Sequence, residues 1–141
     1  CVLVGTVARF GTGPLWMWRH HYYTTVEDRA DVEAVLKEIP PDVSVAAQNH
    51  LLPHLSARRE IYQIVGPDHR RGVAQHAEYV ASVARYVALD MVQSAWPKGP
   101  GYPKALAREL LRRGYGVVAC RGAAVLLCRD APSVSCPVLA Q

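Results

Sequence analysis

Runs of apolar residues divide the chain into short predicted strands and amphipathic predicted helices. Apolar side chains at helical spacing predict a helix over residues 29–38, and Pro40 and Pro41 end it because proline disfavours a continuing helix. Residues 69–83 are ambiguous, although their apolar positions could line one face of a helix. Continuous apolar runs predict buried strands over residues 43–47, 60–65 and 85–90.

The last third of the chain predicts a helix followed by a hairpin. The helix is expected over residues 103–113, because Pro103 suits a first helical turn and Gly114 suits the position after the last one. Two apolar runs, residues 115–120 and 123–128, flank a tight-turn pair and predict an antiparallel hairpin. The order of elements predicts an α/β fold with three layers, a mostly parallel sheet of Rossmann-like character and a C-terminal antiparallel hairpin.

This pattern predicts one soluble α/β domain over residues 24–130. Residues 131–141 hold two prolines and no apolar period, so we expect an irregular tail. Residues 1–23 are expected to be the end of a membrane-proximal segment or a linker. The first eighteen residues carry one charge and lead into aromatic and basic residues typical of a membrane interface. A strand and loop packed on the domain is an equal alternative, and a start at Cys1 rather than Met favours a piece of a longer protein.

Composition and charge exclude some classes of function. A chain of 141 residues, 50% of them hydrophobic and 20% charged, is long enough for one domain with its own core. The net charge of +4 comes from scattered Lys and Arg residues without interleaved aromatic side chains, which disfavours nucleic-acid binding. No glycine-rich phosphate loop or dinucleotide fingerprint follows a predicted strand, and we expect no cofactor.

The four cysteines do not form a zinc or redox motif. Cys1, Cys120, Cys128 and Cys136 include no CxxC pair and no Cys/His spacing typical of zinc. Cys120 and Cys128 lie within apolar runs and are expected to be small buried hydrophobes. A disulfide between these two would require a suitable register of the hairpin strands. The cysteines therefore leave the cellular compartment undecided.

A dense polar cluster follows the first predicted strand and is the main candidate site. Ligands of open α/β sheets usually bind where the strands end. If residues 50–58 are helical, His50, His54 and Arg58 fall on one face and could hold an anion such as a phosphate. The candidate substrate-binding residues are Gln48, Asn49, His50, His54, Arg58, Arg59, Tyr62 and Asp90.

The same residues also fit a purely structural role. His54 or Asn49 would cap the predicted helix. Arg58 or Arg59 would pair with Asp90 or with the neighbouring Glu60 and lock the helix onto the sheet. The cluster is therefore either one face of a site or one face of a brace, and the sequence leaves both open.

The cluster does not identify a reaction. His50 and His54 have the spacing of two zinc ligands on a helix, but the glutamate of an HExxH motif is missing and we expect no metal. Asp90 ends a predicted strand and could act as a base, or it could cap the next segment. No serine lies in a GxSxG context. Catalytic residues remain unassigned.

Residues 39–62 read IPPDVSVAAQNHLLPHLSARREIY, and a strand reading YVALD follows at residues 86–90. This text resembles domain-of-unknown-function family 2079, whose members are predicted polytopic membrane proteins, over roughly residues 28 to 130. The Pro-His-Leu-x-x-Arg core with a following Tyr is the specific part. The family commonly has Phe-Pro after that Tyr, whereas Gln63 and Ile64 follow Tyr62 in this chain.

The resemblance implies a membrane context. The family is grouped with membrane glycosyltransferases that use polyprenyl-phosphate sugars, so this chain would be the soluble C-terminal portion of such a protein, on the extracytoplasmic side of the cell membrane. Its partners would be the membrane part of its own parent chain and a lipid-linked sugar or glycan, with no nucleic acid. In such proteins the catalytic acid usually lies in the membrane part, so this portion would be an accessory domain.

Two other functions stay open. The domain could be purely structural, stabilising the membrane part without a ligand. It could also be a free-standing Rossmann-like enzyme, against which the missing glycine-rich fingerprint argues.

Overall fold

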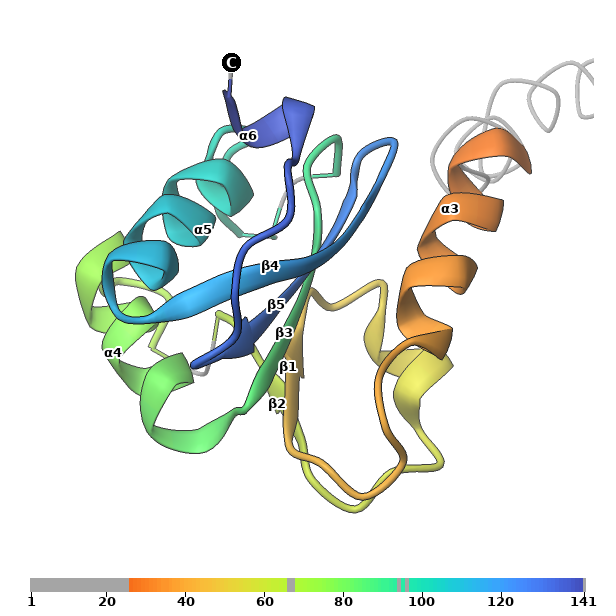
Figure 1. The fold of residues 1–141 in the computed structure, drawn as a ribbon. Helices are drawn as coiled ribbons and strands as arrows, with labels where there is room; N and C mark the ends of the chain where they lie inside the picture. The colour runs from red at the N-terminus through yellow and green to blue at the C-terminus, as the bar shows by residue number, and fades with distance from the viewer. Residues whose placement is uncertain (1–25, 66–67, 94, 96, 141) are drawn as a thin grey trace, which may run out of the picture.

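The computed structural model describes residues 26–65, 68–93, 95 and 97–140. Within these residues, five strands form one sheet with helices on both of its faces (Figure 1). The expected membrane-proximal segment, residues 1–23, lies outside the described residues. None of the helices in the described part is long and apolar enough to cross a membrane.

Helices and strands lie close to where the apolar pattern predicts them, and the ambiguous stretch before residue 83 is helical. The short 3-10 helix is labelled η1. The bounds are α3 (Val26–Lys37), β1 (Val45–Ala47), η1 (Leu52–Leu55), β2 (Ile61–Gln63), α4 (Val73–Val83), β3 (Tyr86–Asp90), α5 (Tyr102–Arg112), β4 (Tyr115–Arg121), β5 (Ala124–Arg129) and α6 (Pro137–Ala140).

The sheet is mixed rather than mostly parallel. Its strand order is β2-β1-β3-β5-β4, in which β1 pairs in parallel with β2 and β3. The predicted hairpin β4–β5 forms, but β5 also pairs antiparallel with β3, so half of the neighbouring pairs are antiparallel. A hairpin must dock through one of its two strands, and the more completely buried β5 takes the inner place. The Rossmann-like character stays a prediction.

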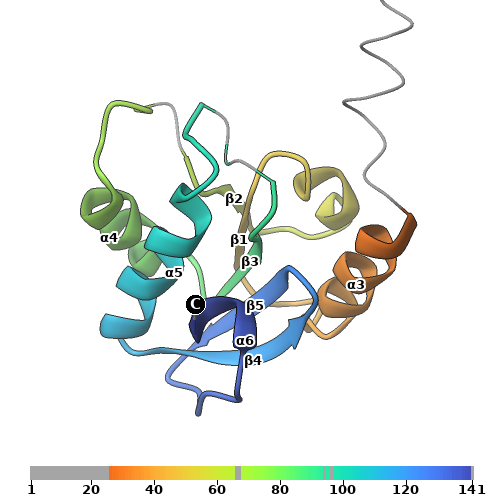
Figure 2. The same ribbon diagram turned by 90° about the horizontal axis from the view of Figure 1, so that it is seen from above.

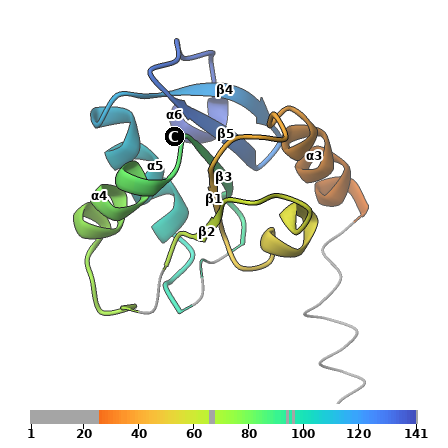
Figure 3. The same ribbon diagram turned by 90° about the horizontal axis from the view of Figure 1, so that it is seen from below.

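Two apolar clusters fill the two faces of the sheet. Helices α4 and α5 cover one cluster, and α3 with η1 covers the other (Figures 2 and 3). Alternate residues of a strand point to opposite faces, so Val125 and Leu127 of β5 join the first cluster and Leu126 joins the second. This double burial explains why the strands read as continuous apolar runs.

The helix that would place His50, His54 and Arg58 on one face, over residues 50–58, does not form. Only Leu52–Leu55 is helical, as the 3-10 turn η1, and residues 56–59 are turns and bends. The chain between β1 and β2 has to travel back along the sheet, and a 3-10 helix rises about 2.0 Å per residue against about 1.5 Å for an α-helix. Leu51 and Leu55 bury their side chains against the sheet and fix this short connection.

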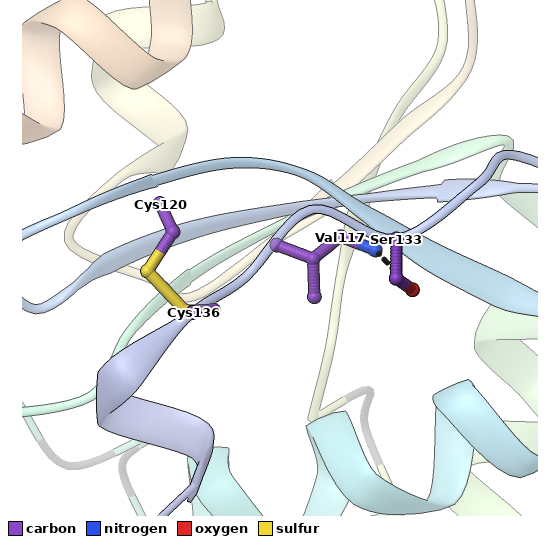
Figure 4. The surroundings of a disulfide bond; sticks show 4 residues. All are labelled: Val117, Cys120, Ser133 and Cys136. Atoms are coloured by element: carbon purple, nitrogen blue, oxygen red, sulfur yellow. Dashed lines mark hydrogen bonds between the residues drawn. A yellow bond between two sulfur atoms is a disulfide. The ribbon is translucent and has the colours of Figure 1, made fainter.

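The predicted irregular tail covers the outer edge of β4. Segment 131–136, called the C-terminal strap below, donates from Val134 N to the carbonyl of Val117 (2.8 Å) and accepts from Val117 N at Ser133 Oγ (3.1 Å; Figure 4). At Gly116 a Cβ would overlap the carbonyl of Ala131, so only glycine permits this approach. The strap satisfies the backbone groups of an edge strand, and α6 then ends the tail.

A disulfide joins the strap to β4. Cys120 bonds Cys136, with their Cα atoms 5.6 Å apart (Figure 4). The expectation that Cys120 is a free buried hydrophobe, which its apolar neighbours suggested, is therefore wrong. Cys128 is free and buried, as expected. A bond between Cys120 and Cys128 is ruled out by the register, because Cys120 pairs with Val125 near the turn and Cys128 pairs with Gly116 near the far end of the hairpin.

Removing this disulfide should destabilise the domain. Closing a loop of about 15 residues stabilises a fold by about 3 kcal/mol in the chain-entropy account, and the sequence separation here is 16 residues. We expect the double substitution Cys120→Ser/Cys136→Ser to lower the free energy of unfolding by about 3 kcal/mol, measured by denaturant unfolding. Cys128→Ala is the control, because it should leave the Cys120–Cys136 bond intact, together with the difference in gel mobility between reduced and unreduced samples that this bond causes. Unchanged stability of the double variant would contradict the assignment.

Candidate functional site

The carboxyl ends of β1 and β3 meet at one edge of the sheet, called the carboxyl edge below. The parallel register pairs Ala47 with Ala88, which places Gln48, just past the end of β1, beside Asp90, the last residue of β3. Both side chains are buried, with residue exposures of 1% and 4%. The fold thus brings together two of the predicted site residues that are 42 positions apart in the sequence.

The Gln48 side chain is fully engaged by the backbone of the neighbouring strand. Its Oε1 accepts from the N–H of Asp90, and its Nε2 donates to the carbonyls of Asp90 (3.1 Å) and Gln93 (3.0 Å). A buried primary amide leaves no net penalty only when its donors and acceptor are paired. Gln48 therefore holds the β3 end in place and is not open to a ligand.

Asp90 is positioned by the same turn and reaches His50. Its Oδ1 accepts from the N–H groups of Val92 (3.0 Å) and Gln93 (3.3 Å), and its Oδ2 lies 3.4 Å from His50 Nε2. Burial alone would raise the pKa of the Asp90 carboxyl, but the hydrogen bond from His50 and the two backbone N–H groups outweigh burial and hold this pKa below its ordinary value. Asp90 is thus a buried carboxylate.

His50 is the part of this arrangement that meets solvent. Its side chain is 37% exposed, while the Asp90 side chain behind it is 6% exposed. A carboxylate fixes the orientation of a histidine ring by accepting from one of its nitrogens, which leaves the other nitrogen to serve a ligand. An oriented histidine of this kind can bind a phosphate oxygen or a hydroxyl, or transfer a proton.

Arg58, predicted to share a face with His50, lies at the opposite, amino edge of the sheet. Its guanidinium donates to the carbonyls of Ile39 (2.6 Å) and Pro40, just after α3. The alternative in which Arg58 pairs with Asp90 is therefore wrong, because residues 56–60 have already returned to the start of β2. The guanidinium ties this return to the end of α3 and acts as a brace.

The remaining predicted residues do not join His50 and Asp90. Arg59 lines a shallow cavity of about 210 Å³ at the amino edge, together with Asp42 and Glu60. His54 is exposed on η1, Tyr62 packs against the cluster under α4 and α5, and Asn49 is half-buried. Of the eight predicted residues, the carboxyl edge thus brings together Gln48, His50 and Asp90.

A second buried polar pair is missing from the predicted set. His76 of α4, only 2% exposed, donates from Nε2 to the carbonyl of Asp68 (3.1 Å) and accepts at Nδ1 from the hydroxyl of Tyr102. Burial lowers the pKa of His76 and raises the pKa of Tyr102 to about 12, so both stay neutral at ordinary pH. Helical spacing already places His76 beside Val73 and Val80 on the apolar face, a signal that would have identified it.

Two further hollows of the described part lie away from His50. One of about 290 Å³ lies at the amino edge between Ser44, Arg85 and Arg129, and another of about 480 Å³ runs along the outer side of α4. Among the described residues, no group of three His, Cys, Asp or Glu side chains could hold a metal ion. The His50–Asp90 pair is therefore the arrangement in this part of the chain best suited to bind a ligand or transfer a proton.

Removing the His50 ring should change how acid affects stability. The pKa of Asp90 lies below its ordinary value in the fold, so ionised Asp90 stabilises the folded state above about pH 4 and this contribution is lost as the pH falls through the lowered pKa. We expect His50→Gln to raise the pKa of Asp90, so that stability is lost at a higher pH than in the unchanged chain. The measurement is the melting temperature over about four pH units around the ordinary pKa of an aspartate. His54→Gln is the control; an equal shift in both variants would argue against the pairing.

Comparison with known proteins supplies a family and nothing narrower. A search of curated proteins and a search of solved structures each find no match. The family model DUF2079, described as predicted membrane protein, matches residues 13–126, which is most of the chain. The chain therefore belongs to the DUF2079 family of predicted membrane proteins.

Proposed function

We propose that this chain provides an extracytoplasmic accessory domain of a membrane-embedded protein resembling glycosyltransferases, and that its carboxyl edge contacts the polar part of a lipid-linked or glycan substrate. The observation that carries the proposal is the half-exposed His50, oriented by the buried carboxylate of Asp90 at the carboxyl ends of parallel strands. Ligands of open α/β sheets usually bind at this edge.

The geometry favours a contact with phosphate or hydroxyl oxygen. His50 Nε2 faces Asp90, so Nδ1 is the ring nitrogen left for a ligand on this partly exposed side chain. The buried Gln48 amide and two backbone N–H groups keep Asp90 fixed, which limits the movement that His50 has to lose on binding. One oriented imidazole suits a positioning contact within a larger site, as expected of an accessory domain.

The disulfide supports the extracytoplasmic side. Disulfides persist in oxidising compartments and are rare in the cytosol of mesophiles. Cys120 and Cys136 lie at bonding distance, and the strap that carries Cys136 also bonds the β4 edge. For a member of a membrane-protein family, an oxidised pair of this kind fits a domain that faces away from the cytosol.

One observation favours the structural alternative. Gln48 and Arg58 both lie within the predicted cluster. Their polar groups hydrogen-bond to backbone carbonyls and N–H groups of neighbouring segments. A domain that only stabilises the membrane part of its parent chain would need such braces and no ligand. The two functions differ in what substitution of His50 changes.

Titration with phosphate probes separates the two functions. We expect inorganic diphosphate and a short-chain prenyl phosphate to shift the His50 ring resonances of the 141-residue chain. His50→Ala should weaken this binding about 10- to 150-fold, since a hydrogen bond to a charged group contributes about 1.5–3 kcal/mol. His54→Ala is the matched control, and Arg58→Ala should lower the melting temperature without changing affinity. If His50→Ala also changes only the melting temperature, the structural alternative holds.

Thiol labelling in native membranes tests the proposed side. We expect Cys120 and Cys136 to resist alkylation until a reductant is added, while denaturation without reductant exposes Cys128 alone among these three cysteines. The readout is the mass of the peptides after labelling in the full-length parent protein. Free thiols at both positions in unreduced membranes would contradict an oxidising location.

A further inference from the structure

Buried side chains join two loops at the carboxyl edge. Residues 68–72 precede α4 and residues 97–101 precede α5, and the two helices lie side by side over one face of the sheet (Figure 2). His76 lies in the first turn of α4 and donates from Nε2 to the carbonyl of Asp68 (3.1 Å). Because Nε2 carries the ring hydrogen of the neutral histidine, Nδ1 accepts from the hydroxyl of Tyr102, the first residue of α5. We call these three residues the His76 bridge.

A second set of contacts joins the same loops beside the bridge. Lys98 donates from Nζ to the carbonyl of Arg71 (2.9 Å), and its Nζ lies 5.7 Å from the centroid of the Tyr102 ring. The Arg71 side chain in turn pairs with the Asp68 carboxylate at 3.0 Å. The loops before α4 and α5 are therefore fixed to one another by polar contacts that surround His76.

The bridge fits the neutral form of His76 and not the protonated form. A protonated imidazole donates from both of its nitrogens, so the Tyr102 hydroxyl would have to accept from Nδ1. The hydroxyl hydrogen would then have no acceptor among the described residues. His76 is 2% exposed and Tyr102 is 9% exposed, so water has little access to replace the lost partner. A buried polar group left without a partner destabilises the arrangement that holds it.

The charges around His76 also disfavour its protonation. The charged groups that face it in the described part are the cations of Lys98 and Arg71 and the carboxylate of Asp68, which is already paired with Arg71. Burial and the two cations hold the pKa of His76 below its ordinary value, although the hydrogen bond to the Asp68 carbonyl acts in the opposite direction. Tyr102, the other titratable partner, stays neutral because burial raises its pKa to about 12.

The loop that ends at the bridge begins beside the candidate site. It leaves β3 after Asp90, and its Gln93 accepts at the carbonyl from Gln48 and donates from its N–H to the Asp90 carboxylate. Gln48 thus holds the start of this loop, whereas Lys98 and Tyr102 hold its end. Opening of the bridge therefore loosens one end of the loop whose other end positions Asp90.

We propose that the His76 bridge is an acid-sensitive switch. Uptake of one proton from solvent by His76 breaks the contact with Tyr102 and separates residues 68–72 from residues 97–101, while the sheet stays folded. The switch responds to the acidity around the domain and changes the mobility of the loop that begins next to the His50–Asp90 pair. The inference rests on the fold alone, and it stands whether or not His50 binds a substrate.

Hydrogen exchange of the 141-residue chain tests the switch over about two pH units below the ordinary histidine pKa of about 6.5. The amides of Lys98 and Tyr102 donate to carbonyls within their own loop and report on its opening. An opening that takes up one proton becomes about tenfold more favourable per pH unit. The protection of these amides, corrected for the intrinsic exchange rate, should therefore fall about tenfold per unit, while amides shared between β3 and β5 keep theirs.

Two substitutions separate the His76 bridge from other effects of acid. In His76→Gln the side-chain amide can still donate to Asp68 and accept from Tyr102, but it does not titrate, so the loop amides should keep their protection. His69→Gln is the matched control, because it removes an exposed imidazole from the same loop and should leave the pH dependence of the unchanged chain. Equal pH dependence in the unchanged chain and in His76→Gln would overturn the proposal. Loss of protection in β3 and β5 at the same pH would also overturn it, because the whole domain would then be opening.

The ring resonances of His76 provide a measurement that needs no variant. In the unchanged chain they should show a neutral ring with its hydrogen on Nε2, and they should titrate together with the loss of protection at Lys98 and Tyr102. Titration of His76 with the loop amides still protected would refute the switch.

Discussion

The paired amide of Gln48 is the interaction on which the carboxyl edge depends. The side chain accepts from the N–H of Asp90 and donates to its carbonyl, so it continues the hydrogen-bonding of the β1–β3 pair by one step beyond the last paired residues. This fixes the turn whose N–H groups hold the Asp90 carboxylate, and the carboxylate in turn orients His50. An unpaired buried amide would lose this chain of contacts and leave polar groups unsatisfied in the core.

Local pattern was sufficient for the elements and insufficient for their partners. Apolar spacing located α3 and α5 and left α4 ambiguous, and turn chemistry located the β4–β5 hairpin, because these depend on neighbouring residues. Which strand of the hairpin docks on β3 is decided by burial over the whole sheet, so the mostly parallel arrangement was a wrong prediction. The helix expected over residues 50–58 failed for a similar reason, since the distance back to β2 decided its form.

The sequence predicted which residues could form the candidate site, and the structure corrected which of them lie together. Gln48, His50 and Asp90 meet because β1 and β3 are adjacent, which no spacing within residues 48–62 reveals. Arg58 belongs to a different kind of structure: like Arg129, which donates to Ala81 and Ala84 near the end of α4, it meets carbonyls at or just after the end of a helix. Cations are favourable at such ends because the last carbonyls of a helix lack partners. The disulfide escaped prediction because residues 131–141 carry no period that would place Cys136 beside β4.

The bond between Cys120 and Cys136 also closes a covalent ring around β5. Every residue of β5 lies between the two cysteines in sequence, so β5 cannot separate far from β4 while the bond is intact. The seam between β3 and β5, which rests on hydrogen bonds and packing alone, is then the natural boundary for partial opening of the folded domain. One unit is the ring together with α5 and α6, and the other is the β2-β1-β3 half with its His50–Asp90 pair. These two units would exchange their amide hydrogens as separate cooperative units.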